Sequence, residues 1–538
     1  RGASSRQPHT AATDCPCDWH QYAGAIAKCA LANHNPPIWA FEPDDARPHG
    51  RRQRRAPICR TMGRMQYHYI ANAAVASSAG RTIAVIDPSD GQPYDEIQRG
   101  TVEDIDAAVR AAQQCYDGVW RSLAPAERGR LLQRLSAKIT ENADELAAIE
   151  QRDCGKPTRQ ARADAAALAR YFEFYAGACD KLHGETIPYQ EGFSVLTWRE
   201  PHGVTGHIVP WNYPMQIFGR CVAAALAAGN VCVVKPSEDA CLSILRVAQL
   251  AAEAGLPAGA INIVTGYGHE VGDALARHPG VRHISFTGSP RIGTLIQQAA
   301  AERHCPVTLE LGGKSPQIVF ADADLDAAVP VIVNAIVQNG GQTCSAGSRV
   351  LIQRGIWDRL TAMLAGRFQA VEARPPDEAA ILGPLISARQ MARVQAYIDA
   401  ATAPLIARGT VAPDVPAGGF YIAPALFGPV DPQSPLAQDE VFGPVLAAIP
   451  FDTEAEAIAI ANGTEYGLAA GIWTRDGDRQ ARVARAMRCG QVYINGYGAG
   501  GGIELPFGGV RKSGHGREKG FVALSEFSRL KTVVHRFG

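Results

Sequence analysis

The organisation of the chain is set by residues 231–264, which read VCVVKPSEDACLSILRVAQLAAEAGLPAGAINIV. The apolar run Val231–Val234 has the length of a buried strand, and so has Ile261–Val264 at the other end of the stretch. The residues between them are rich in Ala and Leu, which favours a helix. A strand, a helix and a second strand form a βαβ unit, so this stretch predicts a parallel sheet.

The same alternation continues on both sides of this stretch. Thr101-Val-Glu-Asp104 resembles a capping box and predicts a helix that starts there. Residues 183–201 break the pattern with short extended pieces, which could leave the domain as an arm. Further strands are predicted at His207–Val209, His283–Phe286, Thr308–Leu311, Gln317–Phe320, Arg349–Ile352 and Gln491–Ile494. The sequence therefore predicts two α/β domains.

Length and charge limit the classes of function. A chain of 538 residues is too long for one ordinary core. Lys plus Arg and Asp plus Glu are equal at 53 each, so no global charge favours nucleic acid or an anionic membrane as a partner. No stretch is apolar enough to span a membrane, and the 13 cysteines have no metal-binding or disulfide spacing. We expect a soluble, cytoplasmic protein with a small-molecule partner and no metal.

Residues 1–64 differ from the rest of the chain. They mix Pro, His, Arg and Cys without a period, and six arginines cluster between Arg51 and Arg64. Acidic residues such as Asp44 spoil the pattern of a transit peptide, and no apolar secretory core is present. The segment is interpreted as a disordered or non-native extension.

Three residues are candidates for catalysis. Cys344 lies in a Gly-rich turn, QNGGQTCSAGS at 338–348, where a thiol can be exposed as a nucleophile. Glu310 ends an apolar strand before two glycines, and desolvation there would raise its pKa enough for a general base. Asn212, in the turn after a strand, could donate to an oxyanion. Taken singly, these residues could equally be a structural cysteine, a surface glutamate and an ordinary turn asparagine.

Two further strand ends are candidates for holding a nucleotide. Lys235 and Glu238 follow a buried strand and suit the hydroxyls of a ribose. Ser289 lies where a strand leads into a helix, in FTGSPRIG at 286–293, and free amides at such a helix start can hold a pyrophosphate. The Gly-x-Gly-x-x-Gly pattern of many dinucleotide sites is not found here, so this stretch alone predicts only an anion site.

Taken together, these motifs resemble the aldehyde dehydrogenase superfamily over roughly residues 66–535. The likeness lies in the order and separation of the segments PWNYP at 210–214, KPSE at 235–238, FTGS at 286–289, LELGGKSP at 309–316, GQTC at 341–344, EVFGP at 440–444 and PFGGVRKSG at 506–514.

The resemblance implies a role for each of these positions. Cys344 would be the nucleophile, Glu310 the general base and Asn212 the oxyanion donor. NAD would be the cofactor, because Glu238 beside the adenosine ribose disfavours the extra phosphate of NADP. The residues implied to bind the cofactor are Trp211, Lys235, Ser237, Glu238, Gly288, Ser289, Leu311, Glu440 and Phe442. Tyr213 and Arg220 would face the substrate, and Arg220 could pair with the carboxylate of a semialdehyde acid or be only an interhelix arginine.

The family's fold implies a Rossmann-like cofactor domain, an α/β catalytic domain and a small β oligomerisation arm. We expect the cofactor domain at 65–309, the arm at about 183–201, the catalytic domain at 310–500, and a segment at 501–538 that returns to the cofactor domain. A strand near Arg529–His535 would complete the arm in a homodimer or homotetramer. Two alternatives remain open: a dehydrogenase that passes the acyl group to coenzyme A, and a non-catalytic protein that reuses the fold.

Overall fold

The computed structural model describes residues 65–498 and 502–537. The interpretation of residues 1–64 as an extension therefore lies outside the described residues. Within them, the predicted α/β class is confirmed by sheets whose parallel strands alternate with helices.

The larger sheet has eight strands in the order β22-β12-β11-β8-β9-β10-β2-β3. The strands from β12 to β10 pair in parallel, and the outer strands β22, β2 and β3 pair antiparallel. In chain order the strands are β2 (His68–Ile70), β3 (Ala73–Val75), β8 (Val204–Val209), β9 (Val231–Pro236), β10 (Ile261–Ile263), β11 (His283–Thr287), β12 (Val307–Glu310) and β22 (Gly514–His515).

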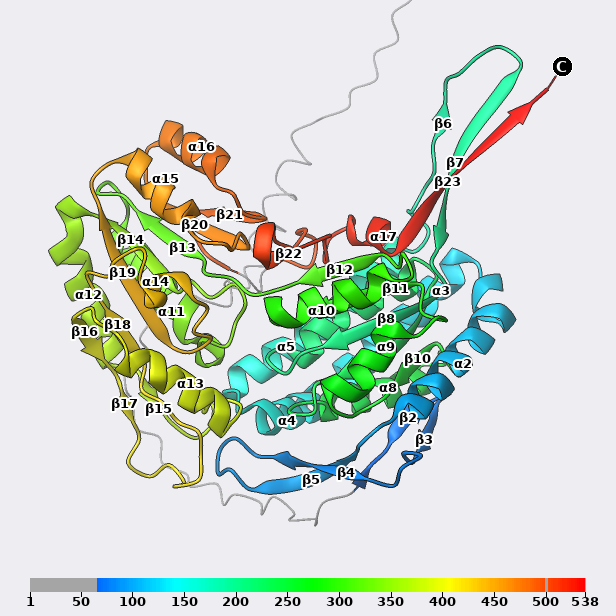
Figure 1. Ribbon diagram of the computed structural model, residues 1–538, viewed down its shortest axis with the longest axis horizontal. Helices are drawn as coiled ribbons and strands as arrows, with labels where there is room; N and C mark the ends of the chain where they lie inside the picture. Colours follow the sequence, from blue (N-terminus) through cyan, green and yellow to red (C-terminus); the bar gives the residue numbers. More distant parts are fainter. Residues whose placement is uncertain (1–64, 499–501, 538) are drawn as a thin grey trace, which may run out of the picture. The chain divides into compact units, whose positions relative to one another are not determined.

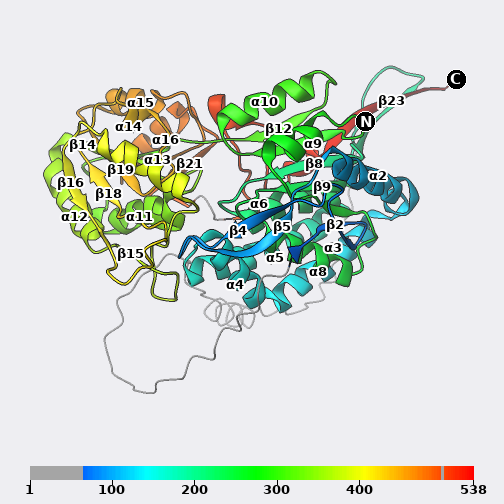
Figure 2. The same ribbon diagram turned by 60° about the horizontal axis from the view of Figure 1, so that its bottom comes forward.

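Helices cover both faces of this sheet because the direction of winding reverses between β8 and β11. The chain runs from β8 to β9 and β10, then crosses back to β11 and β12 on the other side of β8. Figure 2 shows α9 and α10 above β8 and β9, with α3, α4, α5 and α8 below. In such doubly wound sheets ligands bind beyond the carboxyl ends of the strands at the point of reversal.

The helices of this region include the predicted one at residue 101. Thr101 caps α2 and forms the capping box with Asp104. The elements are α2 (Val102–Gly118), η1 (Trp120–Ser122), α3 (Pro125–Glu141), α4 (Ala143–Cys154), α5 (Thr158–Ala178), α6 (Pro214–Phe218), η2 (Gly219–Ala223), α7 (Ala224–Ala227), α8 (Leu242–Glu253), η3 (Gly268–Gly272), α9 (Asp273–Arg277), α10 (Pro290–Ala301) and α17 (Ala523–Glu526).

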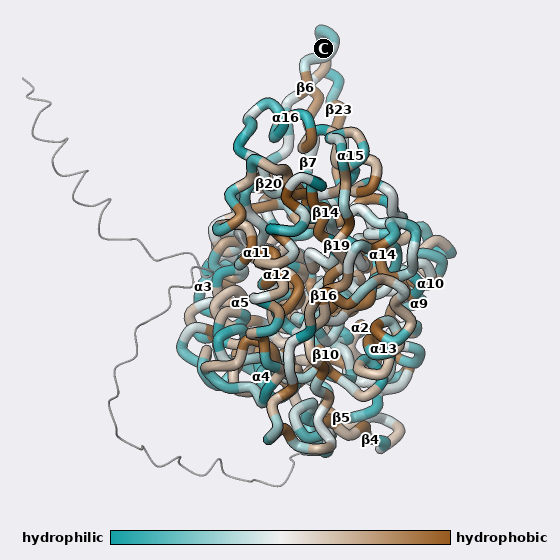
Figure 3. Tube along the Cα trace, turned by 90° about the vertical axis from the view of Figure 1, so that its left-hand side faces the viewer, coloured by the Kyte–Doolittle hydropathy of each residue, from teal (hydrophilic) through white to brown (hydrophobic). Residues whose placement is uncertain are grey.

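The second sheet has seven strands in the order β16-β18-β19-β14-β13-β20-β21. Its strands are β13 (Pro316–Val319), β14 (Arg349–Gln353), β16 (Leu405–Arg408), β18 (Ala425–Phe427), β19 (Val445–Phe451), β20 (Ala469–Trp473) and β21 (Gln491–Ile494). All pair in parallel except β16 with β18. The chain trace in Figure 3 is brown over much of β14 and β20, whose residues are almost all buried.

The second sheet has its own helices, and five further short strands form two small sheets. The helices are α11 (Leu325–Val337), η4 (Gln338–Gly341), η5 (Arg354–Ile356), α12 (Trp357–Gln369), α13 (Ala388–Asp399), α14 (Pro435–Gln438), α15 (Glu454–Asn462), α16 (Gly477–Ala486) and η6 (Arg511–Ser513). The short strands are β1 (Met65–Gln66), β4 (Thr82–Ile86), β5 (Pro93–Gln98), β15 (Glu372–Ala373) and β17 (Thr410–Val411).

A separate three-stranded sheet is formed by β6 (Thr186–Ile187), β7 (Phe193–Pro201) and β23 (Ser528–Arg536). β7 and β23 pair antiparallel along their whole length, from Phe193 opposite Arg536 to Pro201 opposite Ser528. Figure 1 shows these strands as a hairpin-like projection near the C-terminus. The predicted extended arm and its C-terminal strand are therefore present, while the domain boundaries and the role of the arm in assembly stay predictions.

In the described part of the chain no helix is both long and apolar enough to cross a bilayer.

Candidate active site

The predicted site residues of the larger sheet lie at its carboxyl edge. Asn212 follows β8 in the turn before α6, and Lys235 is the fifth residue of β9. Gly288 follows β11, while Glu310 is the last residue of β12. Because β8 and β11 flank the point where the winding reverses, parallel pairing places these ends in one region.

Cys344 lies in the turn between η4 and β14. Three consecutive residues before it adopt positive φ: Asn339 at 49°, Gly340 at 65° and Gly341 at 71°. A side chain at Gly341 would place its Cβ 2.2 Å from the carbonyl oxygen of Gly443, so glycine is required there by contact as well as by conformation. The turn leaves Cys344 partly exposed, as the sequence predicts.

Asn212 is joined to the cysteine turn by hydrogen bonds. Its side-chain amide donates to the carbonyl oxygen of Gln342 at 3.0 Å, and its own carbonyl oxygen accepts from Asn339 Nδ2 at 2.9 Å. An asparagine amide carries two donor hydrogens, so this bond leaves a second hydrogen for another acceptor. The structure thus brings together two predicted residues that are 132 positions apart in the chain.

Tyr213 contacts the same turn through its hydroxyl. Its hydroxyl and that of Thr343 are 3.0 Å apart, and the ammonium of Lys156 lies 4.4 Å from the centre of its ring. Lys156 is itself buried between Glu150 and Asp164. These contacts give Tyr213 a supporting position beside Cys344, and its predicted role toward substrate stays a prediction.

Burial dominates the electrostatics of the two candidate catalytic groups. It raises the pKa of the Cys344 thiol to about 11, although the positive charge of Arg220 opposes the shift. Burial also raises the pKa of Glu310 well above its usual value, in the direction that the sequence predicts. Both carboxylate oxygens of Glu310 lack a hydrogen-bond partner within residues 65–498 and 502–537. The negative charge of Glu310 also raises the pKa of Cys344, because it disfavours the thiolate.

Arg220 has a partner that the sequence did not indicate. Its guanidinium forms an ion pair with Glu518 and donates to the Thr287 hydroxyl at 3.0 Å. Arg220 and Glu518 are both buried, and Ser285 donates a hydrogen bond of 2.6 Å to the same carboxylate. The charge of Arg220 is therefore balanced inside the protein, which removes the main reason to expect it to bind a substrate carboxylate by itself.

Three of the predicted cofactor residues lie at the end of β9. The Lys235 ammonium is 2.8 Å from Glu238 Oε2, so these two side chains form an ion pair. Ser237 is buried beside them and accepts from the Asp239 amide at 3.3 Å. Lys235 and Glu238 offer donors and acceptors side by side, which suits the two hydroxyls of a ribose.

The start of α10 holds the next group. Ser289 is exposed and caps the helix by accepting from the Ile292 amide at 3.4 Å, while Gly288 donates to the Glu310 carbonyl oxygen at 3.0 Å. Leu311 packs against Gly293, where a Cβ would come within 2.6 Å of its side chain. An exposed helix start with a small capping residue is suited to an anion.

Glu440 and Phe442 come from the second sheet's side. Glu440 Oε1 accepts from the Gly313 amide at 2.9 Å, and burial raises the pKa of its carboxyl group to about 7. Phe442 has a positive φ of 60°, and its ring meets that of Trp211 edge to face with 5.4 Å between centres. The loops that carry Trp211 and Gly313, after β8 and β12, therefore contact the loop before β19 that carries Glu440 and Phe442.

This donor set is compatible with a dinucleotide. It combines a Lys–Glu pair for a ribose, a helix start for a pyrophosphate and a second carboxylate, that of Glu440. The glycines between these groups leave the backbone open to close approach.

Sequence reasoning missed several residues around this region. Glu518 and Lys519 follow the last quoted motif, and Lys314 lies inside one without an assigned role. Phe507 pairs with Glu518 through two backbone hydrogen bonds of 2.7 and 2.8 Å. Local sequence offers no signal for contacts between Arg220 and residues about 300 positions later, so only the tertiary structure reveals them.

Comparison with known proteins identifies the class. The sequence profile of the Aldehyde dehydrogenase family matches residues 75–533. A hydroxyisobutyraldehyde dehydrogenase of Mycolicibacterium austroafricanum is 42% identical over 468 residues, which cover 86% of this chain and 92% of the relative. An aldehyde dehydrogenase of Emericella nidulans is 40% identical over 472 residues, or 87% of this chain and 95% of the relative. The chain belongs to the aldehyde dehydrogenase family.

Solved structures agree with this assignment. A Burkholderia cenocepacia protein, described as a candidate aldehyde dehydrogenase, superposes with a TM-score of 0.87 at 66% identity and covers 88% of this chain and 100% of its own. The NAD⁺ complex of a Bacillus cereus aldehyde dehydrogenase gives a TM-score of 0.86 at 36% identity, with 88% and 97% covered. These likenesses extend over both sheets.

Proposed function

We propose that this protein oxidises an aldehyde to the carboxylic acid with NAD as hydride acceptor, through a thioester on Cys344. The observation that carries the proposal is the convergence of Cys344, Glu310 and Asn212. The Asn212 side chain donates a hydrogen bond to the carbonyl oxygen of Gln342, two residues before Cys344. The negative charge of Glu310 raises the pKa of the Cys344 thiol. A nucleophile, a base and an oxyanion donor in one place are the groups that this reaction requires.

The chemistry follows from these three residues. The Cys344 thiolate adds to the carbonyl carbon, and the resulting alkoxide accepts a hydrogen bond from the second amide hydrogen of Asn212. Covalent addition is needed because an aldehyde releases its hydrogen as hydride only from such an alkoxide. The bound nicotinamide supplies the acceptor for that hydride. Glu310 then takes a proton from water, which attacks the thioester and releases the acid.

Residue roles toward the cofactor follow the same proposal. Lys235 and Glu238 would hold the adenosine ribose, with Ser237 next to them. Ser289 and the backbone at Gly288 would meet the pyrophosphate. Glu440 would accept from the nicotinamide ribose, and Trp211, Leu311 and Phe442 would form the apolar walls.

The decisive experiment is the Cys344→Ala variant assayed for aldehyde-dependent NADH formation. We expect turnover in the parent and a loss of at least about a thousandfold in the variant. Binding of NAD to the variant, measured by calorimetry, should stay within about twofold of the parent. A non-catalytic protein would show no turnover in either form. Equal turnover in both forms would rule out the thioester.

The acceptor of the acyl group is water in this proposal. Glu310 supports water because a transfer to coenzyme A needs no base that activates water. Turnover that rises with added coenzyme A and yields the acyl thioester would instead show an acylating enzyme. Product analysis with and without coenzyme A distinguishes the two.

The choice of NAD over NADP rests on Glu238. Its carboxylate beside the proposed adenosine ribose repels a 2′-phosphate, although Lys235 at 2.8 Å offsets part of that charge. We expect kcat/KM to be higher with NAD than with NADP, and Glu238→Gln to narrow the ratio. A preference for NADP in the parent would contradict this assignment.

A substrate that carries a negative charge is a second, narrower proposal. Because Glu518 balances the charge of Arg220, we propose that Lys519 also attracts the substrate. The Lys519 ammonium lies 5.7 Å from the centre of the Phe507 ring, which the Arg220 guanidinium approaches to 5.0 Å. Burial lowers the pKa of Lys519 to about 8, and the charges of Arg220, Glu504 and Cys344 also act on it, so its ammonium can be charged at neutral pH. An aldehyde with a carboxylate would be attracted there.

Matched substrates test this charge preference. We compare 4-oxobutanoate with butanal, which has the same chain length without the carboxylate. Lys519→Met should lower kcat/KM about 30-fold for the acid and less than about threefold for butanal, because only the acid loses a charged partner. Lys138→Met on α3, at a partly exposed position, serves as the control. Equal losses for both substrates would end the proposal.

Assembly through the arm is the last proposal. Three large apolar side chains of β7 and β23 are about half exposed: Trp198 at 50%, Leu530 at 56% and Val534 at 57%. We infer a homodimer or homotetramer in which another copy covers them. Light scattering should find a smaller particle for Leu530→Arg/Val534→Arg, and a monomeric parent would contradict the inference.

A further inference from the structure

Lys314 is a buried lysine whose ammonium has no hydrogen-bond partner in the described part of the chain. It lies between β12 and β13 and is only 2% exposed. Burying a charged group without a partner is costly, so such a group in a native structure needs an explanation. The proposed reaction assigns Lys314 no role.

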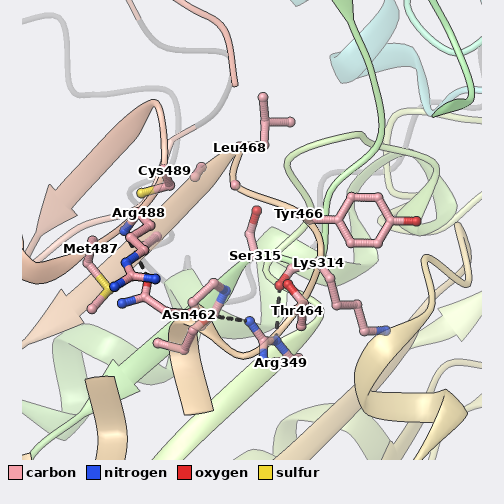
Figure 4. A pocket seen from close by; sticks show the side chains of 15 residues that line it. Lys314, Ser315, Arg349, Asn462, Thr464, Tyr466, Leu468, Met487, Arg488 and Cys489 are labelled. Carbon is pink, nitrogen blue, oxygen red and sulfur yellow. Dashed lines mark hydrogen bonds between the residues drawn. The ribbon is translucent and has the colours of Figure 1, made fainter. Parts of the chain in front are cut away.

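The backbone of Lys314 is held firmly while its side chain turns elsewhere. Arg349 Nε donates to the Lys314 carbonyl oxygen at 3.0 Å, and its terminal nitrogens donate to Ile460 and Ala461. Figure 4 shows the Lys314 ammonium pointing away from the Arg349 guanidinium. The neighbouring cavity, lined by both residues, measures about 10 Å³ and has room for about one water. It is therefore too small for any group larger than a single water.

The charged group that shares this segment is Glu440. Its Oε1 accepts from the Gly313 amide at 2.9 Å, and its Oε2 lies so close to Gly312 that a Cβ there would come within 2.2 Å. The carboxylate thus lies against the two residues that precede Lys314. Glu440 raises the pKa of Lys314, and Lys314 lowers the pKa of Glu440, so each charge acts on the other.

Other charges around the pair are few. Arg393 donates to the Glu440 carbonyl oxygen at 2.7 Å and lowers the pKa of its carboxyl group. Arg349 lowers the pKa of Lys314. Asp439 raises the pKa of Lys314, and Glu440 raises the pKa of Tyr466 and of Cys344. Lys314 is the only buried lysine among the groups that act on Glu440 in the described residues.

We propose that Lys314 is a positioning residue for cofactor binding: it follows the two glycines that the Glu440 carboxylate contacts, and its ammonium acts together with Arg393 and the Gly313 amide to keep that carboxylate ionised, so that Glu440 can accept hydrogen bonds from the nicotinamide ribose. The proposal rests on the proposed function, in which Glu440 holds that ribose. Burial alone would favour a protonated Glu440, and a protonated carboxyl group accepts poorly from two hydroxyls.

The sign of the pH dependence follows from the two titrations. The pKa of Glu440 is raised to about 7 and that of Lys314 is lowered to about 7. As pH falls, Glu440 becomes protonated and the affinity for NAD falls. As pH rises above this range, Lys314 loses its charge while Glu440 stays ionised. A variant without the ammonium should therefore differ from the parent near neutral pH and match it in alkali.

The test is the dissociation constant of NAD, measured by calorimetry between pH 5.5 and 9 without any aldehyde. In Lys314→Met we expect the midpoint of the pH dependence to move up by about one unit, because the counter-charge is lost. NAD binding at pH 7 should then weaken about fivefold, and binding at pH 9 should change less than about twofold. Lys314→Arg, which keeps a cation, should restore the parental midpoint, and Lys138→Met should leave it unchanged.

Other outcomes have definite meanings. Weaker binding by the same factor at every pH, or an unmoved midpoint in Lys314→Met, would overturn the proposal and leave Lys314 a structural residue. Glu440→Gln separates this failure from that of the proposed function. If this variant binds NAD with the parental pH dependence, then Glu440 does not hold the ribose. If Lys314→Arg does not fold, the midpoint of Lys314→Met alone decides.

Discussion

Arg220 and Lys314 are both buried cations, and their surroundings differ. Arg220, in η2, has Glu518 and the Thr287 hydroxyl as partners, and the carboxylate keeps the pKa of the guanidinium above its usual value. Lys314, next to β13, has no hydrogen-bond acceptor in the described residues, and burial lowers its pKa to about 7. The same sign of charge is therefore fixed in one region and able to titrate near neutral pH in the other.

The difference shows that burial alone does not decide whether a charge has a structural or a functional role. A carboxylate in contact makes a buried cation part of the packing, whereas a carboxylate at longer range leaves it responsive to pH. Each region can be altered separately, because the two pairs share no residue.

The largest expected effect follows from breaking the Arg220–Glu518 pair. Glu518→Gln leaves the Arg220 guanidinium buried without its counter-charge, while the amide oxygen can still accept from Ser285. The free energy of unfolding in urea should fall by about 3–5 kcal/mol. The double variant Arg220→Met/Glu518→Gln should recover much of this loss, because no charge remains unpaired. A fall below about 1 kcal/mol would mean that solvent reaches the pair.

At Lys314, in contrast to the Arg220–Glu518 pair, we expect a contribution to the free energy of unfolding that depends on pH. Its pKa is lowered from 10.5 to about 7 in the folded protein, so the unfolded chain binds more protons between these pH values. The stability of the parent should therefore rise with pH in this window, by about 2 kcal/mol between pH 7.5 and 9. Urea denaturation of Lys314→Met should lack that increment. An identical pH dependence in both proteins would show that Lys314 keeps its proton throughout.

The contact between the Tyr213 and Thr343 hydroxyls, beside Cys344, involves no charge, and its effect on stability can be compared with that of the buried ion pair. Tyr213→Phe removes the hydroxyl that lies 3.0 Å from Thr343 but leaves the ring over Lys156. We expect a loss of about 1 kcal/mol in unfolding free energy, since only an uncharged hydrogen bond disappears. The rate of Cys344 alkylation by iodoacetamide should change by less than about threefold. A tenfold change would show that the Tyr213 hydroxyl positions the thiol.

The smallest expected effect is that of the Arg220 charge on the reactivity of the Cys344 thiol. Burial raises the pKa of the Cys344 thiol to about 11, and Arg220 opposes that shift. In the parent the alkylation rate should therefore keep rising up to pH 10, by about tenfold per unit. The double variant Arg220→Met/Glu518→Gln should alter the rate at pH 8 by only about twofold, because the pair is nearly neutral as a whole. A plateau near pH 8 in the parent would contradict the raised pKa.

The residues of the candidate site that lie at the ends of strands could be predicted from the sequence. Asn212, Lys235 and Glu310 each follow or end an apolar strand, and parallel pairing brings such ends to one edge of a sheet. Cys344 could be singled out because three residues before it, Asn339 to Gly341, include two glycines that signal a sharp turn. Glu518, Lys519 and Phe507 could not be found in this way, because their contacts depend on an antiparallel bridge formed near the C-terminus.

The sequence by itself determined the α/β class, the arm strands and the order of the motifs, because hydrophobic periodicity and turn residues are local properties of the chain. Only the tertiary structure decided which buried charges meet. The positive charge of Arg220 is known from the sequence alone. Its pairing with Glu518 rather than with a substrate depends on residues about 300 positions away in the chain. The state of Lys314 was likewise decided by burial and by the charges of Arg349 and Glu440, because the ionisation of a buried group depends on its three-dimensional surroundings.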